Sequence, residues 1–246
     1  IESSARQPFD LAGQPQLRSL WRVVLLQIQS DESVLLLTRH HLISDGWSAG
    51  IFWQELGALY EAFLTQQPSP LPELPIQYAD FASWQQQRFE AGDLRSSLAY
   101  WQQQLSGTVP VLELPSDHPR PAVQSFSGAR YRFTISQAQT AAIKRVAQQE
   151  QATLFMVLLA AFNTLLHRYT QQEDIWIGTP IANRTSIETE RLIGFFANTI
   201  VMRSDLSGNP TFRELIKRVR DRALEAYTHQ SFPFEKLVQV LQPERS

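Results

Sequence analysis

Two apolar segments near the beginning of the chain have the pattern of paired strands. Residues 21–29 and 33–40 are rich in Val and Leu, and the polar residues 30–32 between them suit a turn. We therefore predict a β-hairpin, whose second strand leads directly into a polar segment at residues 40–48.

A helix is predicted after this polar segment. Apolar residues recur there at the spacing of one helix face, namely Phe52, Leu56, Leu59, Tyr60 and Phe63. Asp45 precedes them, in a position to cap the first turn.

A proline-rich stretch then divides the chain. Residues 66–76 contain four prolines. Because proline fixes φ and donates no hydrogen bond, a linker or an extended crossing is predicted there. We place a lobe boundary in this stretch, with residues 1–72 in the first lobe and residues 73–246 in the second.

The second part alternates between strand-like and helix-like segments. Strands are predicted near residues 130–135, 174–181 and 197–203, and helices at 77–90, 95–105, 137–150, 154–169, from 212 onward and near Pro233. Ser136 and Thr153 stand where helix caps are expected. The order of strands and helices follows no strict rule, which favours an α/β fold with mixed sheets.

The helix from residue 212 has the clearest start signal. Thr211 and Glu214 have the spacing of a capping box. The residues predicted to be buried on this helix are Phe212, Leu215, Ile216, Val219 and Ala223.

Composition narrows the class of protein. Of the 246 residues 43% are hydrophobic, enough for a sizeable core, and the net charge of −2 gives no basic footprint for nucleic acid. The absence of cysteine excludes disulfides, thiolate metal sites and a cysteine nucleophile, and it fits a reducing, cytoplasmic setting. No apolar run reaches the length of a membrane span. The polar first residues, without an initiator Met, suggest a chain cut from a longer one.

The main candidate for chemistry is the pair His40 and His41, followed by Asp45 and Gly46. A neutral imidazole accepts a proton near pH 7, because its ordinary pKa is about 6.5. Neighbouring strand residues point to opposite faces, so the two histidines are not expected to share a metal ion. Asp45 is interpreted as an anchor that caps or pairs. On this local pattern alone, two polar residues that merely close a strand remain an equal alternative.

Other residues carry weaker signals. His167 lies in an apolar helix, His118 lies between prolines, and His229 ends a helix, where a cation suits the helix dipole. The chain has no Gly-x-Ser-x-Gly elbow. The aromatic residues 78–84 and 195–196 have the spacing of an ordinary core.

Four motifs occur along the chain, namely His-His-x-x-x-Asp-Gly at 40–46, Tyr-x-Asp-Phe-Ala-x-Trp at 78–84, Ile-Gly-x-Phe-Ala-Asn-Thr at 193–199 and His-Gln-Ser-x-Pro-Phe-Glu at 229–235. Together they resemble the motifs of nonribosomal peptide synthetase condensation domains. They occur in the family's order, with Ala197 in place of the usual Val and Ser231 in place of the usual Asp. The family's early Arg-His-Glu-x-Leu-Arg and late Arg-Asn-Pro motifs are absent. The resemblance thus implies an internal fragment that starts inside the first lobe and stops inside the second.

The resemblance implies a two-lobed, chloramphenicol acetyltransferase-like α/β fold with a tunnel between the lobes. In such a domain an acceptor aminoacyl thioester attacks a donor acyl or peptidyl thioester and forms an amide. Both substrates hang on phosphopantetheine arms of partner carrier domains, so the domain itself is expected to bind no cofactor and no metal. The implied partners are upstream and downstream peptidyl carrier domains and an adjacent adenylation domain, with no nucleic acid and no membrane.

Residue roles follow from the same resemblance. His41 is expected to act as general base or to orient the amine, and the Gly46 backbone is a candidate donor to the oxyanion. His40, Asp45 and Arg184 are expected to be structural, with Asp45 and Arg184 in a buried ion pair. The residues expected to line the tunnel are Trp47, Ser48 and Asn198.

Three alternatives remain open at this point. An acyltransferase of the same fold, free-standing or associated with a polyketide synthase, would form esters. A degenerate module would only recruit partners. The third alternative is that a truncated chain does not fold at all. The 246-residue chain by itself is expected to be inactive and to aggregate, because strand edges that the missing part of the first lobe should cover would be open.

Overall fold

The computed structural model describes residues 7–11, 19–119, 121, 123 and 128–242. The chain forms two compact units, one made of Ile1–Asp93 with Ala182–Ala197 and the other of Leu94–Ile181 with Asn198–Ser246. This division differs from the predicted lobes, because residues 73–93 and 182–197 pack with the first unit. The lobe assignment at residue 72 stays a prediction about the complete domain.

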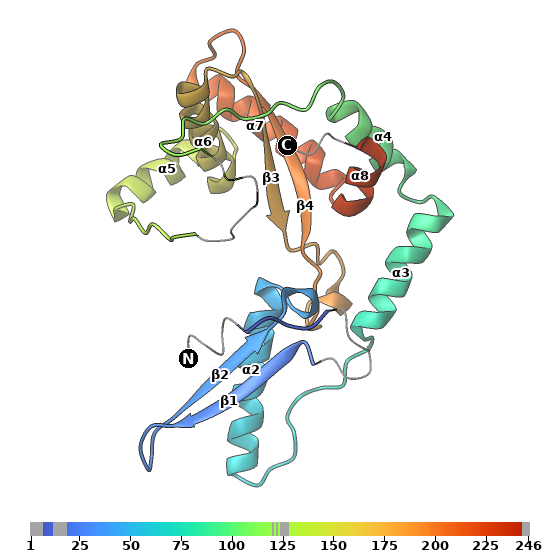
Figure 1. Cartoon of the computed structure of the whole chain (residues 1–246). Coiled ribbons are helices and arrows are strands. Elements are labelled where there is room, and N and C mark those ends of the chain that lie inside the picture. The colour runs from blue at the N-terminus through green and yellow to red at the C-terminus, as the bar shows by residue number, and fades with distance from the viewer. Residues whose placement is uncertain (1–6, 12–18, 120, 122, 124–127, 243–246) are drawn as a thin grey trace. The chain divides into compact units, whose positions relative to one another are not determined.

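The first unit begins with the predicted hairpin. Strands β1 (Trp21–Gln27) and β2 (Ser33–Arg39) pair antiparallel, with Leu25 opposite Leu35. A single 3₁₀ turn, η2 (His41–Ile43), joins β2 to the long helix α2 (Gly46–Leu64), as Figure 1 shows in blue. The predicted cap is confirmed, since the Asp45 carboxylate accepts a hydrogen bond from the Ser48 amide at 2.8 Å.

Helix α3 (Tyr78–Ala91) follows the proline-rich stretch and is the second α-helix among the described residues of this unit. It ends at Gly92, whose φ of 80° lies in the left-handed region that favours glycine at helix ends. The buried cluster of the unit consists of Phe81, Leu192 and Phe196. This cluster joins α3 to the segment 182–197, which also contains the short turn η3 (Ile187–Thr189).

The second unit is built around two strands. Strands β3 (Asp174–Ile181) and β4 (Asn198–Asp205) pair antiparallel, and every second residue of β4 is buried. Helices α6 (Leu154–Thr170) and α7 (Phe212–Thr228) pack on this pair and on each other (Figure 1). Helices α4 (Arg95–Gln104), α5 (Gln137–Gln149) and α8 (Phe234–Leu241) complete the unit.

Two expectations about this unit are wrong. Residues 130–135 form no strand: no other described segment pairs with them, and Tyr131 is 89% exposed. An alternating pattern makes a strand only where a partner completes its hydrogen bonds. Phe212 is 43% exposed, because it is the first residue of α7, and the buried face begins at Leu215.

Both sheets have two strands and are antiparallel, so the parallel pairing that a mixed sheet needs does not form among the described residues. Within the same residues no single helix has the length and apolar composition of a membrane span. Helices α5 and α6 have that length and composition only when they are taken together, and the chain bends by 103° between them.

Candidate functional site

The two histidines lie just beyond β2 and have different neighbours. His40 caps the turn η2, because its Nδ1 accepts a hydrogen bond from the Leu42 amide at 3.1 Å, and its ring meets Phe9 edge-on. His41 is exposed in the turn itself, and its ring meets Phe195 edge-on, with centroids 5.2 Å apart. The histidines therefore face different groups, and the reason is this turn rather than strand alternation.

Asp45 is buried and acts both as a cap and as an ion-pair partner. Its Oδ1 accepts from the Ser48 amide at 2.8 Å, and its Oδ2 accepts from the Phe196 amide at 3.1 Å. The guanidinium of Arg184 lies 3.4 Å from Oδ1, and the side chains of Arg184 and Asp45 are only 1% and 4% exposed. The predicted buried ion pair is thus present.

Arg184 binds several groups besides Asp45. Nη2 donates to Asp45 and, at 2.8 Å, to Ser48 Oγ, while Nη1 donates to the backbone oxygens of Leu192, at 2.9 Å, and of Thr189. The guanidinium also lies 4.0 Å from the centre of the Phe196 ring. The planar fork therefore does not hold the carboxylate through two parallel bonds, because one of its ends is occupied by backbone carbonyls.

These contacts determine the charge of Asp45. Burial alone would raise the pKa of its carboxyl, but hydrogen bonds from Ser48 and Phe196 and the charge of Arg184 outweigh burial and hold the pKa below its ordinary value. Burial lowers the pKa of Arg184, and Asp45 opposes this shift. The pair is accordingly ionised at neutral pH.

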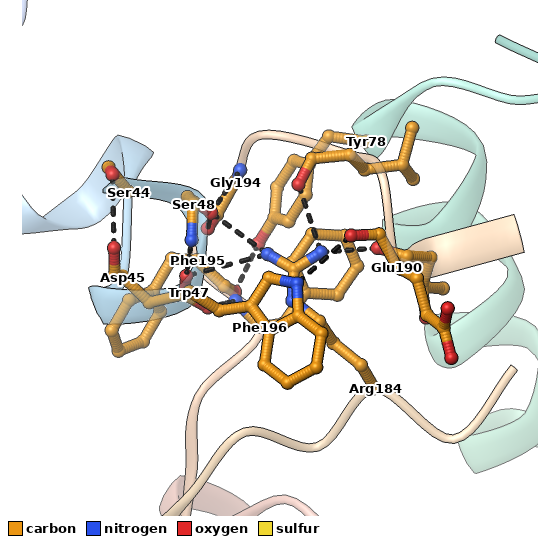
Figure 2. A network of polar contacts seen from close by, with 12 residues as sticks. Ser44, Asp45, Trp47, Ser48, Tyr78, Arg184, Glu190, Gly194, Phe195 and Phe196 are labelled. Atoms are coloured by element: carbon orange, nitrogen blue, oxygen red, sulfur yellow. Dashed lines mark hydrogen bonds and ion pairs between the residues drawn. The ribbon is translucent and has the colours of Figure 1, made fainter. Parts of the chain in front are cut away.

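Ser48 and Trp47 connect α2 to the segment 182–197 (Figure 2). Ser48 is fully buried; its Oγ donates to the Gly194 carbonyl at 2.8 Å and accepts from the Gly194 amide at 3.1 Å. Trp47 is half exposed, and its indole donates to the Glu190 carbonyl at 3.0 Å. Both residues were predicted to line a tunnel; their polar atoms here hold the neighbouring loop.

Tyr78 fastens the same loop from α3 (Figure 2). Its hydroxyl donates to the Phe195 carbonyl at 2.8 Å. Burial, with a smaller effect of the Asp45 charge, raises the pKa of Tyr78, so the hydroxyl stays protonated and remains a donor. Its ring lies so close to Gly194 that a Cβ there would meet Tyr78 Cδ2 at 2.1 Å. Spacing alone predicted an ordinary core for Tyr78 and Phe195, and only the motif match drew attention to their segments.

Gly46 is the first residue of α2, directly after its cap. The first amides of a helix lack acceptors within the helix and carry its positive end. A Cβ at Gly46 would meet nothing within 4 Å, so the backbone here borders open space.

Asn198 belongs to the second unit, at the start of β4. Its amide nitrogen donates to the carbonyls of Gln230 and Phe232, both at 2.8 Å, and its oxygen accepts from the Phe234 amide at 3.0 Å. The side chain therefore holds the loop before α8, and its predicted place in a tunnel stays a prediction.

In the first unit the exposed imidazole of His41 thus lies close in sequence to the buried ion pair of Asp45 and Arg184. Among the described residues no three His, Asp or Glu side chains gather as a metal centre requires. The arrangement suits proton transfer or orientation of a substrate by His41, beside a helix start that stabilises negative charge.

Comparisons with known proteins cover the whole chain. Residues 1–246 match the family model described as Condensation domain. A linear gramicidin synthase of Brevibacillus parabrevis is 52% identical over 242 residues, which are 98% of this chain and 5% of that protein. Chondramide synthase cmdD of Chondromyces crocatus is 48% identical over 246 residues, which are 100% of this chain and 6% of that protein. The chain thus spans a small part of these relatives.

A solved structure gives the same picture of the fold. The X-domain from teicoplanin biosynthesis has a TM-score of 0.90 and 30% identity, covering 99% of this chain and 54% of that one. This likeness confirms the predicted fold class.

Proposed function

Because the chain belongs to the condensation-domain family of nonribosomal peptide synthetases, we propose that it takes part in forming an amide bond between two carrier-bound thioesters. The acceptor amine attacks the carbonyl carbon of the donor acyl or peptidyl thioester and loses a proton. The C–S bond breaks, the phosphopantetheine thiol of the donor carrier leaves with a proton, and the donor chain passes to the acceptor. Both substrates are held on phosphopantetheine arms of carrier domains, and the domain itself holds no cofactor.

The observation that carries this proposal is the state of the His41 ring. It is exposed, and among the described residues no group forms a hydrogen bond to either ring nitrogen. His40, by contrast, uses Nδ1 to cap its own turn. His41 is therefore free to accept a proton from the attacking amine or to orient it.

The neighbouring residues support this role. Asp45 and Arg184 fix the loop that follows His41, and the helix start at Gly46 favours the negative charge that develops on the thioester oxygen. A thioester is already activated, so positioning of the two substrates supplies much of the acceleration.

We assign as partners the upstream and downstream peptidyl carrier domains and the adjacent adenylation domain, in the cytoplasm. The relatives are large synthases, of which this chain matches a small part. The lobes at 1–72 and 73–246 and the tunnel-lining roles of Trp47, Ser48 and Asn198 belong to the same proposal.

The test is a single-turnover reaction in the full-length protein that contains this chain, with loaded carrier domains. We expect His41→Ala to lower amide formation by about 10²–10⁴-fold, the usual contribution of a general acid–base residue. His40→Ala serves as the matched control and should change turnover far less. Near-normal amide formation by a folded His41→Ala protein would remove His41 from the mechanism. A faster reaction with an alcohol than with an amine acceptor would show that the domain forms esters rather than amides.

A further inference from the structure

We propose that Phe195 is a positioning residue, which holds the imidazole of His41 in its reactive orientation. The inference rests on the proposed function of His41. The two rings meet at an interplanar angle of 89° with centroids 5.2 Å apart, the edge-to-face geometry that aromatic pairs prefer.

Phe195 is not a core residue, although it stands beside one. Phe196 is 2% exposed and packs in the buried cluster of the first unit. Phe195 is only half buried, and the aromatic ring that it meets is that of His41. The ring of Phe195 therefore lies outside the buried cluster and stands against His41.

The backbone around Phe195 is held on both sides. Its carbonyl accepts from Tyr78 at 2.8 Å, and the next amide donates to Asp45 at 3.1 Å. The residue before it, Gly194, is bonded through both its amide and its carbonyl to Ser48. Four hydrogen bonds between this backbone and three side chains thus fix it, and only the side-chain torsions of Phe195 remain free to aim the ring.

A catalytic histidine is usually oriented by a hydrogen bond to its second nitrogen. Among the described residues the His41 ring has no such bond, and the edge-to-face contact with Phe195 takes its place. This arrangement leaves both nitrogens of His41 available to the substrates. It makes the ring of Phe195, rather than a carboxylate, the group that limits rotation of the imidazole.

The experiment uses the full-length protein with Phe195→Leu and Phe195→Met, which keep an apolar side chain and remove the ring. Phe195→Tyr keeps the ring, and Phe212→Leu, at an exposed Phe of α7, is the matched control. Two quantities are measured: single-turnover amide formation at saturating loaded carriers, and carbethoxylation of His41 by diethyl pyrocarbonate. Modification is located by mass spectrometry, with the exposed His118 as internal reference.

We expect Phe195→Leu and Phe195→Met to slow turnover about three- to tenfold, with the apparent KM unchanged, in line with the strength of an aromatic pair. His41 should react with the reagent about threefold faster relative to His118, because the ring that restrains and shields it is gone. Phe195→Tyr should restore both values, and Phe212→Leu should change neither. Loss of shielding alone would raise the reactivity of His41 and leave turnover unchanged, so the positioning role requires both changes together.

Two results would overturn the inference. Unchanged turnover and reactivity in a folded Leu or Met variant would refute the role of Phe195 while the proposed function stands. A Tyr variant as impaired as the Leu variant would show that the ring is not the decisive group. A wild-type protein that forms no amide would instead refute the proposed function, and the positioning role with it, whatever His41 reactivity shows.

Discussion

Replacing Asp45 by Ala should strongly destabilise the protein, because three separate interactions disappear together. The cap of α2 is worth about 1 kcal/mol. The Phe196 amide, bonded to Asp45 at 3.1 Å, would be left buried without an acceptor, at about 1–3 kcal/mol. Arg184 would lose its carboxylate, and breaking a buried ion pair from one side typically costs about 3–5 kcal/mol in total. Arg184 keeps Ser48 and two carbonyls, so we expect a loss of about 3–4 kcal/mol in the free energy of unfolding.

Companion variants separate the charge from the cap. Asp45→Asn keeps a side-chain oxygen for the helix and removes the charge, so about half of the loss is expected. Arg184→Ala leaves a carboxylate that still accepts from two backbone amides, so its loss should be about 3 kcal/mol. The double mutant should lose less than the sum of the two single mutants, by about 1–2 kcal/mol.

Urea unfolding of the full-length protein, followed through the first unit's tryptophans, measures these losses. The dependence on pH gives an independent check. Because the pKa of Asp45 is held below its ordinary value in the folded protein, its ionisation stabilises the fold above the unfolded-state pKa of about 3.9. That contribution is lost as the pH falls through the folded-state pKa. The gap between wild type and Asp45→Asn should therefore close below about pH 4. An Asp45→Ala protein within about 1 kcal/mol of wild type would mean that Asp45 is only a cap.

Two further substitutions test the packing of Gly194 in the segment 182–197 and the hydrogen bonds of Asn198 to the loop before α8. Gly194→Ala should impair both folding yield and amide formation, because the new Cβ would lie 2.1 Å from Tyr78. Combining this change with Tyr78→Leu should recover soluble protein. A fully active Gly194→Ala single mutant would refute the close packing. Asn198→Ala should lower the free energy of unfolding, measured by urea denaturation, by about 2–4 kcal/mol, since two carbonyls and one amide lose their partner. Asn198→Asp should have a similar effect, because a carboxylate repels the two carbonyls. A loss under about 1 kcal/mol would contradict this role of Asn198.

Local signals in the sequence were enough to place most helices and strands. Ser136, Thr153 and Thr211 each accept a hydrogen bond from the backbone three residues on, as their positions before apolar helices predicted. The hairpin of β1 and β2 was predictable for the same reason, because a short polar turn separates two apolar runs. Residues 130–135 had an equally good pattern, but a strand depends on a partner elsewhere in the chain, which local pattern does not reveal.

The features of the site could likewise be predicted only where they depend on local signals or on the family motifs. The pairing of Asp45 with Arg184, 139 residues apart, came from the family resemblance and not from spacing. The different positions of Phe195 and Phe196 could not be predicted, because the two residues are identical and adjacent. The Tyr78 hydroxyl donates to the Phe195 carbonyl, and the Asp45 carboxylate accepts from the Phe196 amide; these bonds fix the backbone in the conformation that places Phe196 in the core and Phe195 against His41. Hydrogen bonds to the backbone of a loop cannot be predicted from the residue types of that loop.

The path of the chain between its two units has a consequence for recombination between synthetases. The segment 182–197 returns to the first unit after the chain has built the larger part of the second. A chimera that exchanges only residues 1–93 would import Asp45, Ser48 and Tyr78 from one parent and keep Arg184 and the loop around Gly194 from the other. Such a hybrid inherits the two sides of this polar network from different lineages. Crossovers that carry 182–197 along with 1–93 keep the network within one lineage, and we expect them to yield folded hybrids more often.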